Sequence, residues 1–258
     1  MTAPHTTRAN AARIGLIIPS SNRMVEQEMA HFFPAGVTLH VARLRMTGPH
    51  HMPLEQLLPR IADATRTLTD AKCDVVGFHC TATSMEEGMA GEERVLAAVS
   101  TAGAPRVTST ATAIRRAFDA LGARRIVLVT PYSQHTTDDE AAFLRAAGLD
   151  VLRAVGHALA GSDAYCATPP EVWRERVLAA AHPQADAYLL SCANIASLGV
   201  IDALERELGR PVISSNQAIL WDALTRIAHA DVDRCPGRLF AVDAGQAGQS
   251  APRVAHRQ

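Results

Sequence analysis

The 258-residue sequence lacks the apolar run that a membrane-spanning helix requires, because nothing in it approaches about 20 consecutive apolar residues. Residues 1–13 contain Thr, Pro, Asn, His and Arg but no apolar core segment, which argues against a secretory signal. We therefore expect a protein without membrane partners, in which residues 1–12 form a flexible N-terminal arm.

The sequence also lacks a strong charge of either sign. It has 25 Lys and Arg against 26 Asp and Glu, so nucleic acid, which favours clustered basic residues, is not an expected partner. Gly15, Gly77 and Gly156 do not have the spacing of a phosphate-binding loop, so no nucleotide cofactor is indicated. An anionic ligand would have to be held by local contacts.

Cysteines are few and scattered. There are five, an odd number, without the close pairs of a zinc site or of a small disulfide framework. The sequence thus predicts no metal, and a reducing cytoplasm is the simplest compartment. For Cys73, Cys166 and Cys235 we favour the role of small buried hydrophobes. The other two, Cys80 and Cys192, belong to a pattern.

That pattern is an internal repeat. Cys80 and Cys192 each end a short apolar run and begin a small, polar one, and they are 112 residues apart. Pro19 and Pro131 also follow apolar runs and have the same separation. A repeat this long indicates two duplicated half-domains rather than a solenoid, whose repeats run roughly 20–50 residues.

Compact apolar runs rich in β-branched residues predict strands, which alternate with amphipathic helical patterns such as Leu54, Leu57, Leu58 and Ile61. Strands that are apolar throughout are typical of a mainly parallel sheet covered on both faces. We therefore expect an α/β fold of two pseudo-symmetric Rossmann-like halves, each a mainly parallel sheet flanked by helices, with the active site in the cleft between them. The expected strands are 13–18, 37–44, 75–78, 107–108, 125–129, 150–156, 187–190 and 212–213.

The expected boundaries follow from this division. Residues 13–118 form the first half and residues 119–228 the second, with a C-terminal helix near 217–228 able to pack back on the first half. Residues 229–258 form a partly disordered tail, because Pro and Gly occur there among small residues.

Both cysteines of the repeat follow predicted strands. In a parallel α/β fold, ligands gather beyond the carboxyl ends of the strands, near helix N-termini whose free amides favour anions. A thiol at such a terminus has a lowered pKa and can act as a nucleophile or as a proton donor and acceptor. We therefore interpret Cys80 and Cys192 as a matched pair of reactive thiols.

The chain resembles the aspartate/glutamate/hydantoin racemase superfamily, and within it the branch of maleate cis-trans isomerases and arylmalonate decarboxylases. The resemblance covers about residues 13–228. The decarboxylases of this branch have a glycine where Cys80 stands and keep only the cysteine that matches Cys192, so two cysteines favour an isomerase or racemase. The segments that carry the resemblance are 15–22, 75–84, 129–132, 190–192 and 211–216, together with Trp221.

The resemblance implies a homo-oligomeric, cofactor-independent cis-trans isomerase of a small dicarboxylate such as maleate. Cys80 would attack the alkene as nucleophile, and Cys192 would donate and recover a proton. The isomerases also supply an asparagine from the second half ahead of the second cysteine, and this chain has none between His157 and Cys192. The implied substrate-binding residues are Ser20, Asn22, Thr81, Tyr132, Ala193 and Asn194.

Alternatives remain open. A two-thiol racemase or epimerase of an amino acid or hydantoin would remove an α-proton with one thiol and return a proton with the other. A decarboxylase of a malonate-like acid would release carbon dioxide, and a non-catalytic binding protein would keep only the cleft. Asn22 could instead cap a helix, and Tyr132 could be a packing residue. His79 is expected to pack away from the site, since adjacent strand residues face opposite sides.

Overall fold

A computed structural model describes residues 11–46 and 52–242 of the chain. The first half contains β1 (Ala12–Pro19), α1 (Val25–Phe32), β2 (Val37–Leu44), α2 (Leu54–Asp70), β3 (Val75–Phe78), α3 (Thr81–Met85), α4 (Gly88–Thr101), β4 (Val107–Ser109) and α5 (Thr110–Ala120). The second half contains β5 (Arg125–Thr130), α6 (Gln134–Ala146), β6 (Asp150–Gly156), α7 (Gly161–Ala167), α8 (Pro170–Ala179), β7 (Ala187–Leu190), η1 (Leu198–Val200), α9 (Ile201–Leu208), β8 (Val212–Ser214) and α10 (Ser215–Arg226). A short turn of helix, η2 (Arg238–Ala241), follows.

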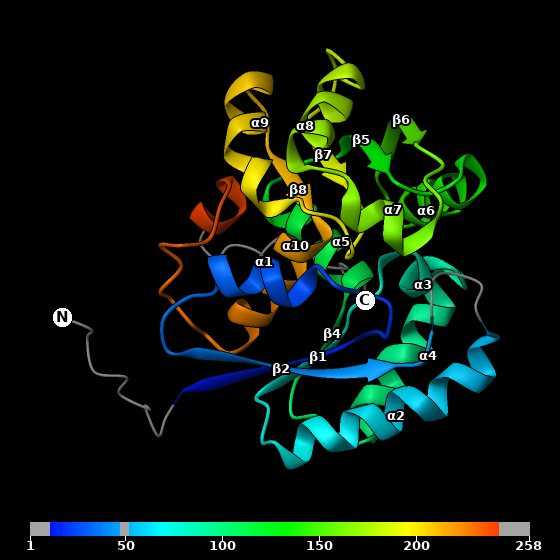
Figure 1. Cartoon of the computed structure of the whole chain (residues 1–258), viewed down its shortest axis with the longest axis vertical. Helices are drawn as coiled ribbons and strands as arrows, with labels where there is room; N and C mark the ends of the chain where they lie inside the picture. Colours follow the sequence, from blue (N-terminus) through cyan, green and yellow to red (C-terminus); the bar gives the residue numbers. More distant parts are fainter. Residues whose placement is uncertain (1–10, 47–51, 243–258) are drawn as a thin grey trace, which may run out of the picture.

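The described strands form two four-stranded parallel sheets with equivalent strand orders, β2-β1-β3-β4 and β6-β5-β7-β8. Helices flank both sheets, with α2 and α4 outside the first and α8 and α9 outside the second (Figure 1). The predicted α/β fold of two similar halves is confirmed, and all of the expected strands are present.

The repeat extends to side-chain contacts at the start of each half. Asp74 accepts a hydrogen bond from the Arg13 amide at 2.8 Å, and Asp186 accepts one from the Arg125 amide at 2.8 Å. Both members of the second pair follow their counterparts by 112 residues. The separation read from Cys80 and Cys192 is therefore a structural period and not a coincidence of two residues.

Alternate residues of the central strands face opposite sides of each sheet. In β1, Ile14, Leu16 and Ile18 belong to the apolar core between the two sheets, whereas Ile17 belongs to the outer core under α2 and α4. The strand β5 repeats this arrangement in the second half. Because both faces of each sheet are covered, the central strands β3 and β7 are buried and apolar throughout, as predicted, whereas the edge strands β2 and β6 also carry exposed polar residues.

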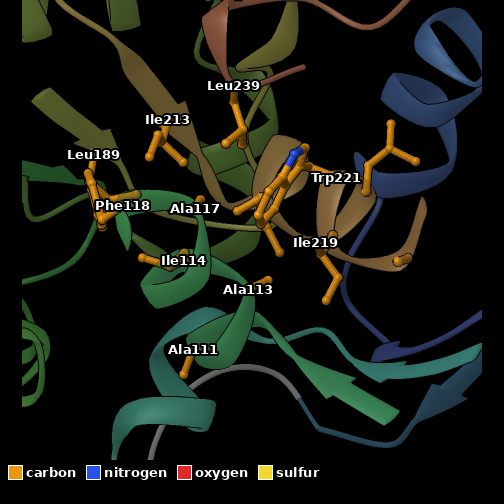
Figure 2. Packing of buried hydrophobic residues seen from close by; sticks show 14 of the residues in the cluster. Ala111, Ala113, Ile114, Ala117, Phe118, Leu189, Ile213, Ile219, Trp221 and Leu239 are labelled. Carbon is orange, nitrogen blue, oxygen red and sulfur yellow. The ribbon is translucent and has the colours of Figure 1, made fainter. Parts of the chain in front are cut away.

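The helices α5 and α10 pack together at the centre of the molecule (Figure 1). Figure 2 shows their apolar contact, in which Phe118 and Trp221 are buried. Asp222 of α10, fully buried, accepts from Thr108 Oγ1 at 2.5 Å and forms an ion pair with Arg116 of α5. Since α10 also contacts β3 and β4, the helix that ends the second half packs on the first.

The ends of the described chain add detail to the expected boundaries. Ala12, expected in the arm, begins β1, and residues 1–10 lie outside the described residues. In the expected tail, Leu239 is buried in the central core and the Gly237 amide donates to Asp202 of α9 at 2.8 Å. Residues 243–258 of the tail that we expected to be partly disordered lie outside the described part. None of the helices described here has the length and apolarity to span a membrane.

Candidate active site

A cavity lies at the carboxyl ends of the strands and takes residues from both halves. Cys80 reaches it from the end of β3 and Cys192 from the end of β7, and both thiols are buried. The positions related by the repeat therefore meet at one place. The lining residues are Pro19, Ser21, Asn22, Cys80, Thr81, Ala82, Tyr132, Ser162, Tyr165, Cys192, Ala193 and Asn194.

Among the residues predicted to bind substrate, Ser20 alone does not line this cavity. It is exposed, and its hydroxyl donates to the Met46 carbonyl at 3.2 Å. Ser21 lines the cavity instead. The chain turns directly after Pro19, and this turn decides which of the two serines faces inward. We therefore replace Ser20 by Ser21 in the candidate site.

Cys80 is the N-cap residue of α3, a helix of only five residues. Its thiol donates to Thr83 Oγ1 at 3.2 Å. Burial raises the pKa of the Cys80 thiol, and hydrogen bonding with Thr83 opposes this rise. The lowered pKa that we expected at a helix N-terminus is therefore not found, because desolvation outweighs the hydrogen bonds that this short helix offers.

Cys192 is followed by a loop and not by the expected helix N-terminus. The Asn194 amide donates to its sulfur at 3.3 Å, within this loop. Burial raises the pKa of the Cys192 thiol to about 12, although hydrogen bonds from Tyr132 and from the Asn194 amide lower it. Both thiols are thus protonated at neutral pH in the free site, so a thiolate must form with the help of substrate and neighbouring donors.

Ser215, the first residue of α10, connects the two thiol-bearing segments. Its hydroxyl oxygen accepts from Thr81 Oγ1 at 2.8 Å and from the Cys192 amide at 3.1 Å. Thr81 directly follows Cys80 in the chain. One serine hydroxyl thereby fixes both segments against the helix that lies between the halves.

His79 is fully buried and packs away from the cavity, as predicted. Its Nδ1 pairs with Thr110 Oγ1 at 2.9 Å, and its Nε2 pairs with Asn216 Oδ1 at 2.9 Å. The Asn216 amide nitrogen donates to the buried carboxylate of Glu28, so Oδ1 is the atom that accepts from histidine. Burial lowers the pKa of His79 to about 4. The imidazole is therefore neutral and serves as a structural link.

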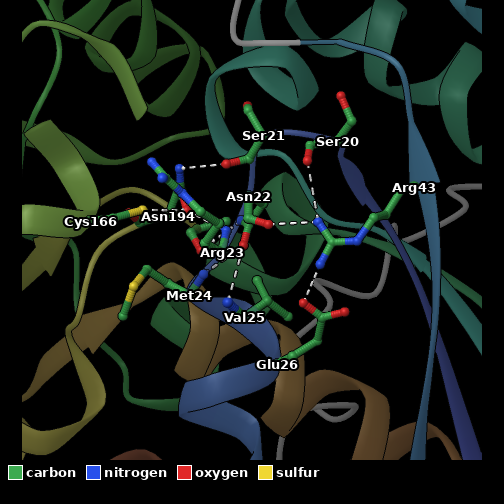
Figure 3. Close-up of polar contacts among 11 residues, drawn as sticks. Ser20, Ser21, Asn22, Arg23, Met24, Val25, Glu26, Arg43, Cys166 and Asn194 are labelled. Carbon is green, nitrogen blue, oxygen red and sulfur yellow. Dashed lines mark hydrogen bonds and ion pairs between the residues drawn. The ribbon is translucent and has the colours of Figure 1, made fainter. Parts of the chain in front are cut away.

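The loop after β1 crosses to the second half (Figure 3). Asn22 Nδ2 donates to the Ala193 carbonyl at 2.9 Å, and its Oδ1 accepts from two amides at the start of α1 at 3.0 and 3.1 Å. Asn194 Oδ1 in turn accepts from the Arg23 amide at 2.9 Å. Asn22 therefore borders the cavity and holds the start of α1 at the same time.

The short helix α7 covers one side of the cavity, and the sequence did not predict this. It contributes Ser162 and Tyr165, and the Tyr165 ring meets the Tyr132 ring edge to face, with centroids 5.8 Å apart. An exposed ion pair between Arg23 and Asp163 at 2.6 Å joins α7 to the first half. No residue of α7 is buried. Because the helix has no buried apolar face, its sequence lacks the apolar periodicity from which we could have predicted it.

The described residues that line the cavity include no Asp, Glu, Lys, Arg or His. An anionic ligand would therefore be held by amides, hydroxyl groups and asparagine side chains. Within the part of the chain that the structure describes, no group of three or more His, Cys, Asp and Glu side chains could hold a metal ion. The remaining cysteines are buried (Cys73) or half-buried (Cys166 and Cys235), and none lines the cavity.

Two similar α/β halves, with a cysteine from each half facing one cavity, place the chain in the racemase-like superfamily of aspartate and glutamate racemases. Residues 14–240 match the sequence model of one branch, described as arylmalonate decarboxylase. The chain belongs to the arylmalonate decarboxylase family, and it is therefore an enzyme.

Characterised relatives carry two different activities. The chain is 31% identical to a maleate isomerase of Nocardia farcinica over 248 residues, which cover 90% of this chain and 96% of the relative. It is 28% identical to the arylmalonate decarboxylase of Bordetella bronchiseptica over 237 residues, which cover 90% and 98%. A mutant of the Nocardia farcinica maleate cis-trans isomerase with a covalently bound succinylcysteine intermediate has a similar structure, with a TM-score of 0.82, 28% identity and coverage of 90% and 99%.

Proposed function

We propose that the protein is a cofactor-independent cis-trans isomerase of a small cis-dicarboxylate of the maleate type. The observation that carries this proposal is the pair Cys80 and Cys192, which occupy equivalent positions of the two halves and line one cavity. A reaction that needs a single thiol has no use for the second. Similarity to maleate isomerases supports isomerisation over the other two-thiol reactions.

In the first step, the Cys80 thiol gives up its proton to the solvent as the substrate binds, and the resulting thiolate adds to one alkene carbon and forms a C–S bond. The Cys80 sulfur takes up this proton again when the product leaves. The electron pair of the double bond moves to the neighbouring carbon, where the adjacent carboxylate delocalises it. That carbon takes the proton of Cys192, which becomes a thiolate. The adduct is a succinyl thioether of Cys80, the same kind of species as the succinylcysteine in the Nocardia farcinica structure.

In the second step, the former double bond is a single bond, and half a turn about it exchanges the cis for the trans arrangement. The Cys192 thiolate then removes the proton from carbon. The C–S bond breaks, its electron pair returns to the Cys80 sulfur, and the trans-dicarboxylate leaves. Both sulfur atoms end as they began, so the cycle balances without an oxidant or a reductant.

Negative charge develops on the sulfur atoms and on the substrate carboxylate, and neutral donors must stabilise it. Thr83 acts on Cys80, and Tyr132 and the Asn194 amide act on Cys192. Asn22 borders the cavity beside them. A preorganised donor of this kind typically contributes about 2.7–4 kcal/mol to lowering the barrier. Such donors replace the cationic side chains that the described cavity lining does not include.

A decarboxylase of a malonate-like acid is the second candidate, because the matching sequence model carries that activity and the Bordetella bronchiseptica relative spans nearly the same length. Its reaction would break a C–C bond, release carbon dioxide and leave an enediolate that takes a proton from a thiol. Cys192 alone would suffice for this proton. The presence of Cys80 therefore favours the isomerase.

The decisive test is proton NMR of maleate in deuterated buffer, with the wild-type protein and with Cys80→Ala and Cys192→Ala. We expect the wild type to form fumarate and each variant to form none above the uncatalysed rate. Cys235→Ala is the matched control, because this half-buried thiol lies outside the cavity, 3.4 Å from the Phe32 carbonyl. It should leave the rate unchanged.

A folded wild-type protein that leaves maleate unchanged would contradict this substrate. Carbon dioxide release from substituted malonates would then identify the decarboxylase. Solvent deuterium at the α-carbon of amino acids or hydantoins would identify a racemase, which uses the same two thiols to remove and return a proton.

A further inference from the structure

A buried carboxyl group that the proposed reaction does not use lies next to the candidate site. Glu140 of α6 is only 1% exposed. Its Oε2 accepts a hydrogen bond from the Ser191 hydroxyl at 2.8 Å, whereas its Oε1 has no hydrogen-bond partner among the described residues. An unpartnered carboxyl oxygen in a protein interior calls for an explanation.

Glu140 is coupled to the site by the chain and by charge. Ser191, which it binds, directly precedes Cys192, and Tyr132 lies in the turn that leads into α6. In its ionised form, the carboxyl group acts electrostatically on Cys80, Cys192 and Tyr132, and raises the pKa of each. It does not line the cavity, so it would act through other residues.

An ionised carboxylate is costly in a protein interior where one of its oxygens has no hydrogen-bond partner. Burial accordingly raises the pKa of Glu140 to about 8, although the Ser191 hydrogen bond lowers it. In the neutral acid, one oxygen still accepts from Ser191. The geometry thus favours the uncharged form at neutral pH.

We propose that Glu140 is a positioning residue, whose neutral carboxyl group holds Ser191 against α6 and keeps negative charge away from the two thiols. This proposal rests on the two-thiol function proposed above, and it concerns the ionisation of the thiols rather than the identity of the substrate. When Glu140 loses its proton, the new charge opposes formation of a thiolate at either cysteine. Above the pH at which Glu140 ionises, it therefore lowers the fraction of each cysteine that is present as thiolate.

Three titratable groups interact electrostatically with Glu140, namely Cys80, Tyr132 and Cys192. The pKa values of the two thiols and of the Tyr132 phenol are raised, so Glu140 is the group among these four that changes charge between pH 7 and 9. The elements packed against α6 also carry charged side chains, namely Glu86 at the end of α3, Glu92 of α4 with its partner Arg115, and Asp150 and Arg153 of β6, while α6 itself carries Asp138 and Asp139.

The test measures thiol reactivity instead of turnover, so it does not depend on the substrate. Alkylation of Cys192 by iodoacetamide is followed by peptide mass spectrometry from pH 6 to 10, in the wild type and in Glu140→Gln. Far below its pKa, the thiolate fraction and hence the rate rise about tenfold per pH unit. We expect this slope throughout in the Gln variant, which carries no charge at this position.

In the wild type, we expect the slope to flatten between pH 7 and 9, where Glu140 ionises. The two proteins should then differ by about tenfold at pH 9 and above for a coupling of one pK unit. Ser191→Ala removes a hydrogen bond that favours the ionised carboxylate, so it should move the flattened region to higher pH. A merely structural glutamate would leave all three profiles parallel.

A second measurement reads Glu140 directly and does not require that Glu140→Gln folds. The 13Cδ signal of Glu140, assigned by its shift in Ser191→Ala, should titrate near pH 8. A midpoint near the ordinary glutamate value of about 4.3 would overturn the proposal, and so would equal tenfold slopes for the wild type and the Gln variant. Neither readout uses maleate, so the two proposals can fail separately.

Discussion

Asn22 donates through Nδ2 to the carbonyl of Ala193, 171 positions further along the chain, at 2.9 Å. The other end of the same amide accepts from the first amides of α1. A single side chain in the first half thereby holds the start of a helix and the residue that follows Cys192 in the second half. The shape of the cavity depends on this bridge between the two halves.

Substitution of Asn22 separates its two contacts. Asn22→Ala should lower the free energy of unfolding by about 1 kcal/mol, the usual effect of losing a capping oxygen. Asn22→Ser keeps an oxygen that can cap α1 but has no donor that reaches Ala193, so it should recover the part of the stability that comes from the cap without recovering isomerase activity. Urea unfolding and the maleate assay measure the two effects. Full activity in the Ser variant would mean that Asn22 serves only as a cap.

The Tyr132 hydroxyl is expected to matter for turnover. It lowers the pKa of Cys192 by hydrogen bonding, so Tyr132→Phe raises that pKa and disfavours the thiolate formed after proton transfer. Loss of one such donor typically slows a reaction about 10²–10³-fold. The control is Tyr188→Phe, since the Tyr188 hydroxyl, among the residues that the structure describes, bonds to the His182 backbone, away from the cavity. A Tyr132→Phe enzyme as fast as this control would remove Tyr132 from the mechanism.

His79 should make the fold sensitive to acid. Burial lowers its folded-state pKa to about 4, whereas an unfolded histidine has a pKa near 6.5. The stability that depends on neutral His79 is present above pH 6.5 and is lost as the pH falls toward 4, by roughly 1.4 kcal/mol per unit. His79→Gln should therefore be less stable than the wild type at pH 7.5, with a gap that narrows at pH 5.5 and 4.5.

Chemical unfolding at these pH values measures that gap. His135→Gln is the matched control, because the His135 side chain is 84% exposed and its ion pair with Asp139 is long, at 3.9 Å. The free energy of unfolding of His135→Gln should match that of the wild type at each of these pH values. A gap for His79→Gln that stays constant with pH would mean that His79 keeps its ordinary pKa in the fold.

Glu28 is predicted to be the strongest polar contact between α1 and the loop after Cys192. Its carboxylate accepts from the Ser197 amide at 2.5 Å and from the Leu198 amide at 2.7 Å, and also binds Asn216. Glu28→Gln turns one acceptor into a donor and leaves a buried donor unpartnered, which costs about 1–3 kcal/mol. Urea unfolding should show this loss.

Glu26→Gln on the same helix is the control for this substitution. Glu26 forms a surface ion pair with Arg43, and such pairs contribute about 0–1 kcal/mol. Equal effects of the two substitutions would show that the buried network around Glu28 adds no more stability than an exposed pair.

The fold followed from the sequence because the central parallel strands, which are covered on both faces, form short apolar runs. The expected ranges 75–78 and 187–190 coincide with β3 and β7, and the cysteines that follow them meet at one cavity. The repeat added the relation between the halves, which local patterns alone do not provide. These predictions depend on hydrophobic periodicity and on the direction of each strand, and both follow directly from the order of residues in the sequence.

The missed features depend on three-dimensional packing. The turn after Pro19 brings Ser21 inward and leaves Ser20 exposed, and no residue type distinguishes these neighbours. Glu140 follows two acidic residues on α6, where the sequence alone favours a solvated face, yet its side chain is buried. The raised pKa of Cys192 has the same origin, because burial of a thiol is a property of the packed interior.

Two copies of a half on one polypeptide need not stay alike. In a site assembled from two identical chains, every substitution near one sulfur would also occur near the other. Here the two sheets keep equivalent strand orders, while Cys80 faces Thr83 and Cys192 faces the Asn194 amide. Covalent fusion thus frees the surroundings of each sulfur to be selected separately, so that one can specialise in attack and the other in carrying a proton.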